Sequence, residues 1–281
     1  MRVTTHDVGA VAANDGQSCT KPHYERPMHS TNERDDARRR GLIRALATAL
    51  LGSTWFANAA FANESWFKNW IGQRPTKLRP GQSIYRISGS VRVNDQPADD
   101  HTIIHAGDTI RTGHDGELVF VVGFDAMLLR ANSWIALVAE SIGSEVLAGF
   151  RLVDGAVLSA FGAGQVKELN TTTAEIHVPG TRPSVMYLRA SMDNTYFCTC
   201  YGDTDVAARG DPAESLKVRT KHHDRPLSIL SNIRDGHYIH AAVFEDHKDV
   251  EVALINALVG REPPSSFSGP YGDVLPPPTP Y

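Results

Sequence analysis

Short apolar runs, separated by turn residues, dominate the sequence from residue 84 to about residue 229. Several runs alternate apolar and polar positions, which is typical of strands that bury one face. In the first part of this region the pattern predicts strands at 84–93, 102–104, 109–111, 117–122, 126–130, 134–138, 146–153 and 156–161. Asp115-Gly116 and Asp154-Gly155 lie between runs and supply the positive φ angles that tight turns require. Short strands with this spacing predict an all-β core, arranged as a sandwich or in a solenoid-like way.

The pattern changes near the C-terminal end, where apolar residues recur with a helical period. These residues are Val250, Leu254, Ile255, Leu258 and Val259, and Gly260 follows them as a stop signal. The single apolar face predicts a short helix that packs on the sheet. We therefore divide the chain after residue 62 into a lead-in segment at 63–83, a β-domain at 84–230, a C-terminal helical segment at 231–262 and a Pro-rich disordered tail at 263–281.

Residues 1–62 have the order of an N-terminal extension followed by a secretory signal peptide. Basic Arg38, Arg39 and Arg40 precede an apolar run, and Ala60 and Ala62 form a small-x-small cleavage site. The apolar run is shorter than the ~20 residues that a membrane-spanning helix needs. We expect cleavage after Ala62 and a periplasmic protein, which would stay at the membrane only if this segment were uncleaved.

Two features of this N-terminal region have alternative interpretations. The paired arginines followed by Gly41, Leu42 and Ile43 fit a twin-arginine export signal as well as ordinary Sec export. Translation from Met28 is a further hypothesis, because the residues before it are polar and without pattern.

Composition and motif content exclude several classes of protein. The 41% hydrophobic and 21% charged residues are ordinary for a globular chain of 281 residues, and the net charge of −4 argues against nucleic acid as a partner. The sequence has no Gly-x-Ser-x-Gly elbow, no His-Glu-x-x-His motif, no phosphate-binding loop and no Cys-x-x-Cys-His haem motif. We therefore expect a non-enzymatic protein without an organic cofactor.

The candidate chemistry lies in a Cys-x-Cys segment, Cys198 and Cys200, on a predicted strand. Residues i and i+2 of a strand face the same side, with Cα atoms ~6.6 Å apart, near the upper limit for a disulfide. Three interpretations follow: two buried free thiols, a strained and reducible disulfide, or a metal site. For a zinc or copper(I) site, His222 or His223 would supply the nitrogen donor, and only one of these neighbours would reach the ion.

Two further clusters combine carboxylates with imidazole and could bind a cation. They are Asp99-Asp100-His101 and Glu245-Asp246-His247. Solvated loops commonly have such a composition, and we assign both clusters to polar loops. For the His222-His223 pair, too, we favour an exposed polar loop over a metal site.

Several motifs in the β-region resemble the FecR domain family of exported β-domains. The motifs are Ser88-Gly89-Ser90-Val91, a Gly-Asp-x-Ile-x-Thr-Gly unit at 107–113, Gly155-Ala156-Val157, and Cys-x-Cys-Tyr-Gly at 198–202. The resemblance extends from about residue 84 to about residue 264. It departs from the family at 176–182, where His177 and Pro179 replace the glycine and arginine of an Ile-Gly-x-Arg-Gly-Thr motif.

This resemblance implies an exported binding or scaffolding module, whose partner is an unidentified envelope protein or ligand. It allows a link to envelope sensing or iron-uptake regulation. The alternative hypothesis is a metal-binding or redox protein that uses Cys198 and Cys200 with His222 or His223.

Overall fold

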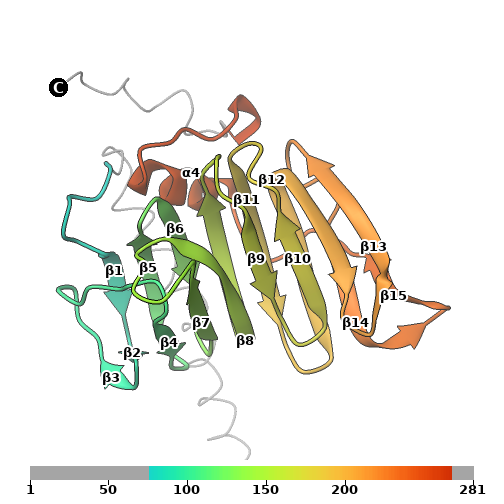
Figure 1. Cartoon of the computed structure of the whole chain (residues 1–281), viewed down its shortest axis with the longest axis horizontal. Helices are drawn as coiled ribbons and strands as arrows, with labels where there is room; N and C mark the ends of the chain where they lie inside the picture. The colour runs from blue at the N-terminus through green and yellow to red at the C-terminus, as the bar shows by residue number, and fades with distance from the viewer. Residues whose placement is uncertain (1–75, 268–281) are drawn as a thin grey trace, which may run out of the picture. The chain divides into compact units, whose positions relative to one another are not determined.

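The computed structural model of the chain describes residues 76–267, which contain fifteen strands, one α-helix and one short 3-10 helix (Figure 1). The predicted signal peptide, with Arg38, Arg39, Arg40, Ala60 and Ala62, lies outside the described residues, as does most of the predicted lead-in segment. The all-β class and the short C-terminal helix are confirmed. Within residues 76–267, no helix combines the length and the apolar character needed to cross a bilayer.

The strands form two sheets, and two long strands belong to both. In order of pairing, sheet A contains β1 (Ile84–Ser88), β5 (Glu117–Val122), β6 (Asp125–Leu129), the second half of β8 (Leu147–Phe161), β11 (Ser184–Ala190), the first half of β12 (Asn194–Ala208), β14 (Leu227–Arg234) and β15 (His237–Ala241). Sheet B contains β3 (Gln96–Pro97), β2 (Val91–Val93), β4 (Thr109–Thr112), β7 (Trp134–Ala139), the first half of β8, β9 (Lys167–Asn170), β10 (Ala174–Val178), the second half of β12 and β13 (Asp211–Thr220).

Five of these strands close into a ring, in the order β8, β11, β12, β10 and β9, with β9 returning to β8 as a parallel neighbour. The ring is a barrel-like core, and the other strands are hydrogen-bonded outside it. Each ring strand contributes to one buried apolar cluster, for example through Phe150, Leu169, Ile176, Leu188 and Val206. The predicted sandwich or solenoid-like arrangement of the whole domain stays a prediction.

A glycine with positive φ marks the point where each long strand passes from one sheet to the other. Gly155 in β8 has φ 88° and Gly202 in β12 has φ 109°. A Cβ atom on Gly155 would lie 2.2 Å from Ser133 Oγ, and one on Gly202 would lie 2.1 Å from Ser184 Oγ. Both positions therefore require glycine, because the backbone is left-handed and another segment of the same chain approaches it closely.

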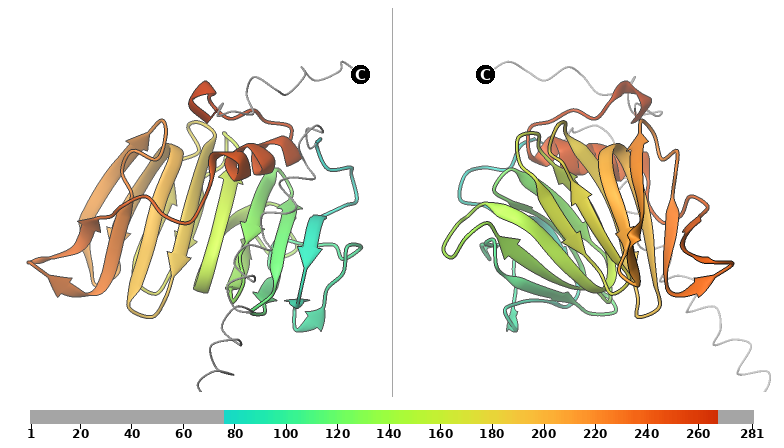
Figure 2. Two further views of the ribbon diagram at one scale, coloured as in Figure 1. Left: turned by 180° about the vertical axis from the view of Figure 1, so that it is seen from behind. Right: turned by 45° about the vertical axis from the view of Figure 1, so that its right-hand side comes forward.

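The α-helix α4 (Asp249–Leu258) lies across the strands, against β6 and β8 (Figure 2). Of its predicted apolar face, Leu254, Ile255 and Leu258 are buried, whereas Val250 and Val259 are half-buried, and Val252 is buried in addition. Glu251 anchors its first turn: the Glu251 carboxylate receives hydrogen bonds of 2.6 and 2.7 Å from Arg130 and caps the backbone N–H of Lys248 at 3.0 Å. Packing and this ion pair together fix the helix on the sheet.

Several predicted elements differ from those observed. Residues 102–104 form no strand, and the run at 84–93 is two strands because Gly89, with φ 61°, turns the chain between β1 and β2. Asp154-Gly155 is not a turn: the positive φ of Gly155 serves a crossing inside the continuous strand β8.

Two predicted C-terminal boundaries also differ. The β-pattern continues past residue 230, because the Asp235-Gly236 turn, with positive φ at both residues, returns the chain as β15. The first residues of the predicted disordered tail are ordered, since Ser265–Phe267 forms the 3-10 helix η2 and Phe267 is buried; the rest of the predicted tail lies outside the described residues.

Replacement of Gly202 by alanine should destabilise the fold more than the same replacement at Gly107. Both residues have similar positive φ angles, 109° and 99°, but a Cβ atom at Gly107 meets nothing within 4 Å. Each variant should lose the ~1–3 kcal/mol typical of a left-handed non-glycine residue. Gly202→Ala should lose more because of the contact with Ser184. The free energies of unfolding in urea measure the difference, and equal losses would contradict the crossing geometry.

Candidate metal centre

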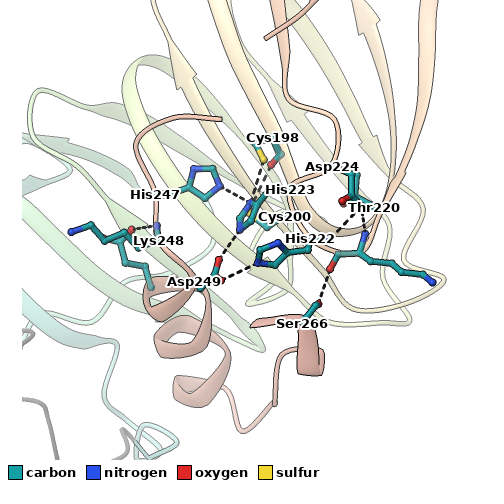
Figure 3. A network of polar contacts seen from close by, with 12 residues as sticks. Cys198, Cys200, Thr220, His222, His223, Asp224, His247, Lys248, Asp249 and Ser266 are labelled. Atoms are coloured by element: carbon teal, nitrogen blue, oxygen red, sulfur yellow. Dashed lines mark hydrogen bonds and ion pairs between the residues drawn. The ribbon is translucent and has the colours of Figure 1, made fainter. Parts of the chain in front are cut away.

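Two cysteines and two histidines converge beside the first half of β12 (Figure 3). Cys198 and Cys200 lie on β12, His223 lies in the loop between β13 and β14, and His247 precedes α4. All four residues are buried, and their four donor atoms lie within 4.8 Å of one another. The set therefore offers two sulfur and two nitrogen donors to a single point.

The pairing of β12 explains why both thiols are available there. On the β11 side, Thr199 pairs with Met186 and Tyr201 pairs with Val185, so Cys200 is the extra residue of a β-bulge. On the other side, β14 pairs with β12 only as far as Phe197. Beyond Phe197, the loop that carries His223 lies beside β12 in place of β14 and bonds to the Cys200 backbone.

His223 is fixed by its backbone and by both ring nitrogens. Its backbone N–H donates to the Cys200 carbonyl oxygen at 2.9 Å, and its φ of 51° is unusual for a residue other than glycine. On the ring, Nδ1 lies 3.5 Å from Cys198 Sγ, and Nε2 lies 3.1 Å from an Asp249 carboxylate oxygen. The strained backbone thus directs the imidazole between the thiol and the first residue of α4.

His247 is held in the same way from the opposite side. Its Nε2 lies 3.0 Å from His223 Nδ1, and its Nδ1 lies 2.7 Å from the backbone oxygen of Glu245. Its ring stacks on Tyr187 with a centroid distance of 4.6 Å. Figure 3 shows the two imidazoles and Cys198 directed toward one another.

The outer partners of the histidines determine which ring nitrogens carry protons. The Asp249 carboxylate and the Glu245 carbonyl oxygen can only accept, so His223 Nε2 and His247 Nδ1 must donate. In neutral imidazoles the inner nitrogens then have no proton, and two lone pairs face each other across 3.0 Å beside a thiol. The Cys198 thiol can donate its proton to His223 Nδ1, which satisfies one of these nitrogens, whereas a metal ion would satisfy both.

The cysteines differ in their acid–base behaviour. A hydrogen bond from the Cys200 thiol, with the nearby imidazoles of His223 and His247, lowers the pKa of Cys198 below its ordinary value in spite of burial. Burial raises the pKa of Cys200, and the negative charge of Cys198 adds to this effect. Cys198 is therefore the cysteine that loses its proton more readily, and the thiolate is the form of cysteine that binds metals.

The donor set fits a tetrahedral metal ion. Zinc bonds of about 2.3 Å to sulfur and 2.0–2.1 Å to nitrogen imply donor separations of about 3.3–3.8 Å. The observed 3.5 Å between Cys198 Sγ and His223 Nδ1 lies in this range, and the 3.0 Å between the two nitrogens requires a small outward shift. Each histidine also donates its outer N–H to a carboxylate or carbonyl oxygen, as metal-bound histidines in proteins usually do.

Aromatic side chains cover the centre. Besides Tyr187, Phe244 lies against the rings of His223 and His247 with centroid distances of 4.5 and 4.7 Å. Phe267 lies 5.1 Å from the His223 ring. An enclosed site with four protein donors is typical of a structural metal ion, whereas a catalytic ion keeps one position open.

Cys198, His223 and Asp249 also have the order of a nucleophile, a base and an orienting carboxylate. However, Cys198 is fully buried, and Cys200 and His247 occupy the space around its sulfur. A neighbouring cleft of about 500 Å³ is lined by Tyr201, Gly202 and Lys221 but not by Cys198. The geometry therefore favours metal binding over covalent catalysis.

The structure brings together three of the four residues predicted for this site. Cys198 and Cys200 are free thiols, not a disulfide, and His223 reaches them. His222 does not: its ring is 41% exposed, and its Nε2 binds Asp249 at 2.9 Å. His222 thus contributes to the outer shell only.

His247 is the donor that sequence reasoning missed, because its charged neighbours Glu245 and Asp246 indicated a solvated loop. Two signals could have found it: a Cys-x-Cys and one histidine leave a fourth position unfilled, and an aromatic residue, Phe244, precedes it closely. The other cluster, at Asp99, is a polar loop as expected. Its carboxylate accepts hydrogen bonds from the His101 backbone and the Thr102 hydroxyl at 3.0 Å.

No family model and no curated protein matches this chain. Two solved structures described as candidate anti-sigma factors from Parabacteroides distasonis are similar to it. They show 11% and 12% sequence identity with TM-scores of 0.38 and 0.39, over 48% and 52% of this chain. The matches span 58% and 63% of those proteins, so this chain covers less than two thirds of each. The FecR resemblance stays a prediction from the motifs.

We expect both cysteines of the folded protein to be free thiols. Alkylation in denaturant without a reducing agent should label Cys198 and Cys200 together, and mass spectrometry of the peptide that carries both should show two added groups. An unlabelled peptide lighter by two hydrogens would show a disulfide and contradict the observed state.

Proposed function

We propose that this protein is a non-enzymatic, metal-binding β-module that acts after export, as a binding or scaffolding domain of the cell envelope. One observation carries the metal assignment: four buried donor atoms converge, and the outer nitrogens of both histidines are already held by acceptors. This arrangement directs two nitrogen lone pairs and two cysteine sulfur atoms at one point, where a metal ion would satisfy all of them.

Charge balance favours a divalent ion. When a metal binds, both cysteines become thiolates, because a coordinating thiol is deprotonated. Zinc with two thiolates and two neutral imidazoles forms a centre without net charge, whereas copper(I) leaves one negative charge. An uncompensated charge is costly in a site enclosed by Tyr187, Phe244 and Phe267. We therefore propose zinc.

The proposed setting rests on the sequence. The basic, apolar and small-x-small order that ends at Ala62 supports export, and the FecR-type motifs support a role in envelope sensing or iron-uptake regulation. In the fold, the Gly-Asp-x-Ile-x-Thr-Gly unit leads into β4: the Asp108 carboxylate accepts from Asn94 and from the His105 backbone, both at 2.7 Å. These residues build the turn before β4, so the motif has a structural role in this fold.

The purified chain should contain one zinc ion, and loss of an inner donor should remove it. Elemental analysis should give a stoichiometric metal for the unmodified protein and for His222→Ala, whose side chain belongs to the outer shell. His223→Ala and His247→Ala should lose the metal. Asp249→Asn should weaken zinc binding by ~10–100-fold, as removal of a second-shell partner does.

A matched control tests whether these effects are specific. His240→Ala changes a histidine on β15 whose ring contacts the His237 backbone oxygen and none of the four donors. This variant should keep its zinc. Metal-free protein under all conditions, or equal zinc in the His240→Ala and His247→Ala variants, would refute the assignment.

Export predicts a defined N-terminus. Protein recovered from the periplasm should begin at Asn63, and substitution of Ala62 by a large residue should leave the longer form in the membrane fraction. Protein found in the cytoplasm with residues 38–62 intact would contradict the proposed location.

A further inference from the structure

Residues 242–248, which we name the strap, connect β15 to α4 without forming helix or strand. The strap carries His247, the fourth donor of the centre. The other three donors are held independently of it: Cys198 and Cys200 by the pairing of β12 with β11, and His223 by its backbone hydrogen bond to Cys200. A three-donor half-site therefore exists on the sheet, and the strap completes it.

Few other contacts hold the strap. Val243 and Phe244 are 72% and 49% exposed, so this part of the strap buries little apolar surface. Glu245 and Asp246 form ion pairs with Arg189, but all three side chains are well exposed, and such pairs stabilise little. The Glu245 backbone N–H donates to the Tyr196 hydroxyl at 3.0 Å. The main inward ties of the strap are therefore His247 and the Phe244 ring, which both contact the centre, together with a 3.4 Å hydrogen bond from Arg130 to the Asp246 backbone oxygen.

Both ends of the strap are anchored without the centre. At the start, the Ala242 backbone N–H donates to the Pro226 oxygen at 2.9 Å. At the end, α4 is held by its buried apolar face and by the ion pair between Glu251 and Arg130. The strap can therefore leave the sheet while its two ends stay in place.

From these contacts we propose that the metal ion closes the strap over the centre, so that zinc binding fixes residues 242–248 and zinc removal releases them. The proposal rests on the metal assignment above and adds to it a conformational consequence. Release would uncover Tyr187, on which His247 stacks, and the Tyr196 hydroxyl that binds Glu245. The ion would thus control exposure of an aromatic face of sheet A.

Hydrogen exchange measured by mass spectrometry, on zinc-loaded and chelator-treated protein, tests this. Removal of zinc should speed exchange in strap peptides by at least ~10-fold, with changes below about twofold in α4 and in β11. In His247→Ala, saturating zinc should fail to protect the strap, while His240→Ala should behave as the unmodified protein does. Zinc content is measured on the same samples.

The zinc content separates two kinds of failure. Stoichiometric zinc with no change in hydrogen exchange of the strap overturns the proposal that zinc fixes the strap, and it leaves the metal assignment standing. Faster exchange of α4 and the strap together after zinc removal also overturns the strap proposal, because the ion would then hold the whole C-terminal region. Protein that binds no zinc overturns both proposals.

Discussion

The strand β12 must serve two sheets, and the candidate metal centre is built where it crosses between them. At Gly202 the chain turns from its partners β11 and β14 to its partners β10 and β13, which closes the ring of strands. The same crossing ends the pairing with β14 and places a bulge at Cys200. The loop with His223 fills the gap that results, so the geometry of the fold and the geometry of the centre have one origin.

The second constraint is electrostatic. Asp249 and the Glu245 carbonyl oxygen each hold one outer imidazole nitrogen, which directs the inner nitrogens of His223 and His247 toward each other and toward the Cys198 sulfur. A buried group of acceptors of this kind is costly unless a cation satisfies it. In this respect Asp249 joins the helix to the centre, because it is both the first residue of α4 and the outer partner of His223.

Much of the fold could be predicted from short-range patterns. A short continuous apolar run identified the strand that became β5, and the helical period identified α4 and most of its buried face. Asp-Gly pairs were less informative, since Gly155 uses its positive φ for a sheet crossing and Gly236 for a hairpin turn. A sequence does not distinguish a glycine at a sheet crossing from one in a hairpin turn, because the difference lies in which other segment approaches the backbone.

The candidate site was less accessible from the sequence. Facing side chains at i and i+2 brought Cys198 and Cys200 into consideration, but the choice between His222 and His223 depends on a loop conformation that no periodicity encodes. His247 is brought to His223 only by the path of the chain between β15 and α4, and its acidic neighbours concealed it. Long-range convergence of this kind is set by topology, which local pattern does not determine.

X-ray absorption at the metal edge of the purified protein tests the central claim most directly, because it reports the atoms bound to the ion. The account predicts two sulfur atoms at about 2.3 Å and two nitrogen atoms at about 2.0–2.1 Å. A first shell of oxygen and nitrogen atoms only, or a shell with a single sulfur atom, would contradict a centre formed by Cys198, Cys200, His223 and His247.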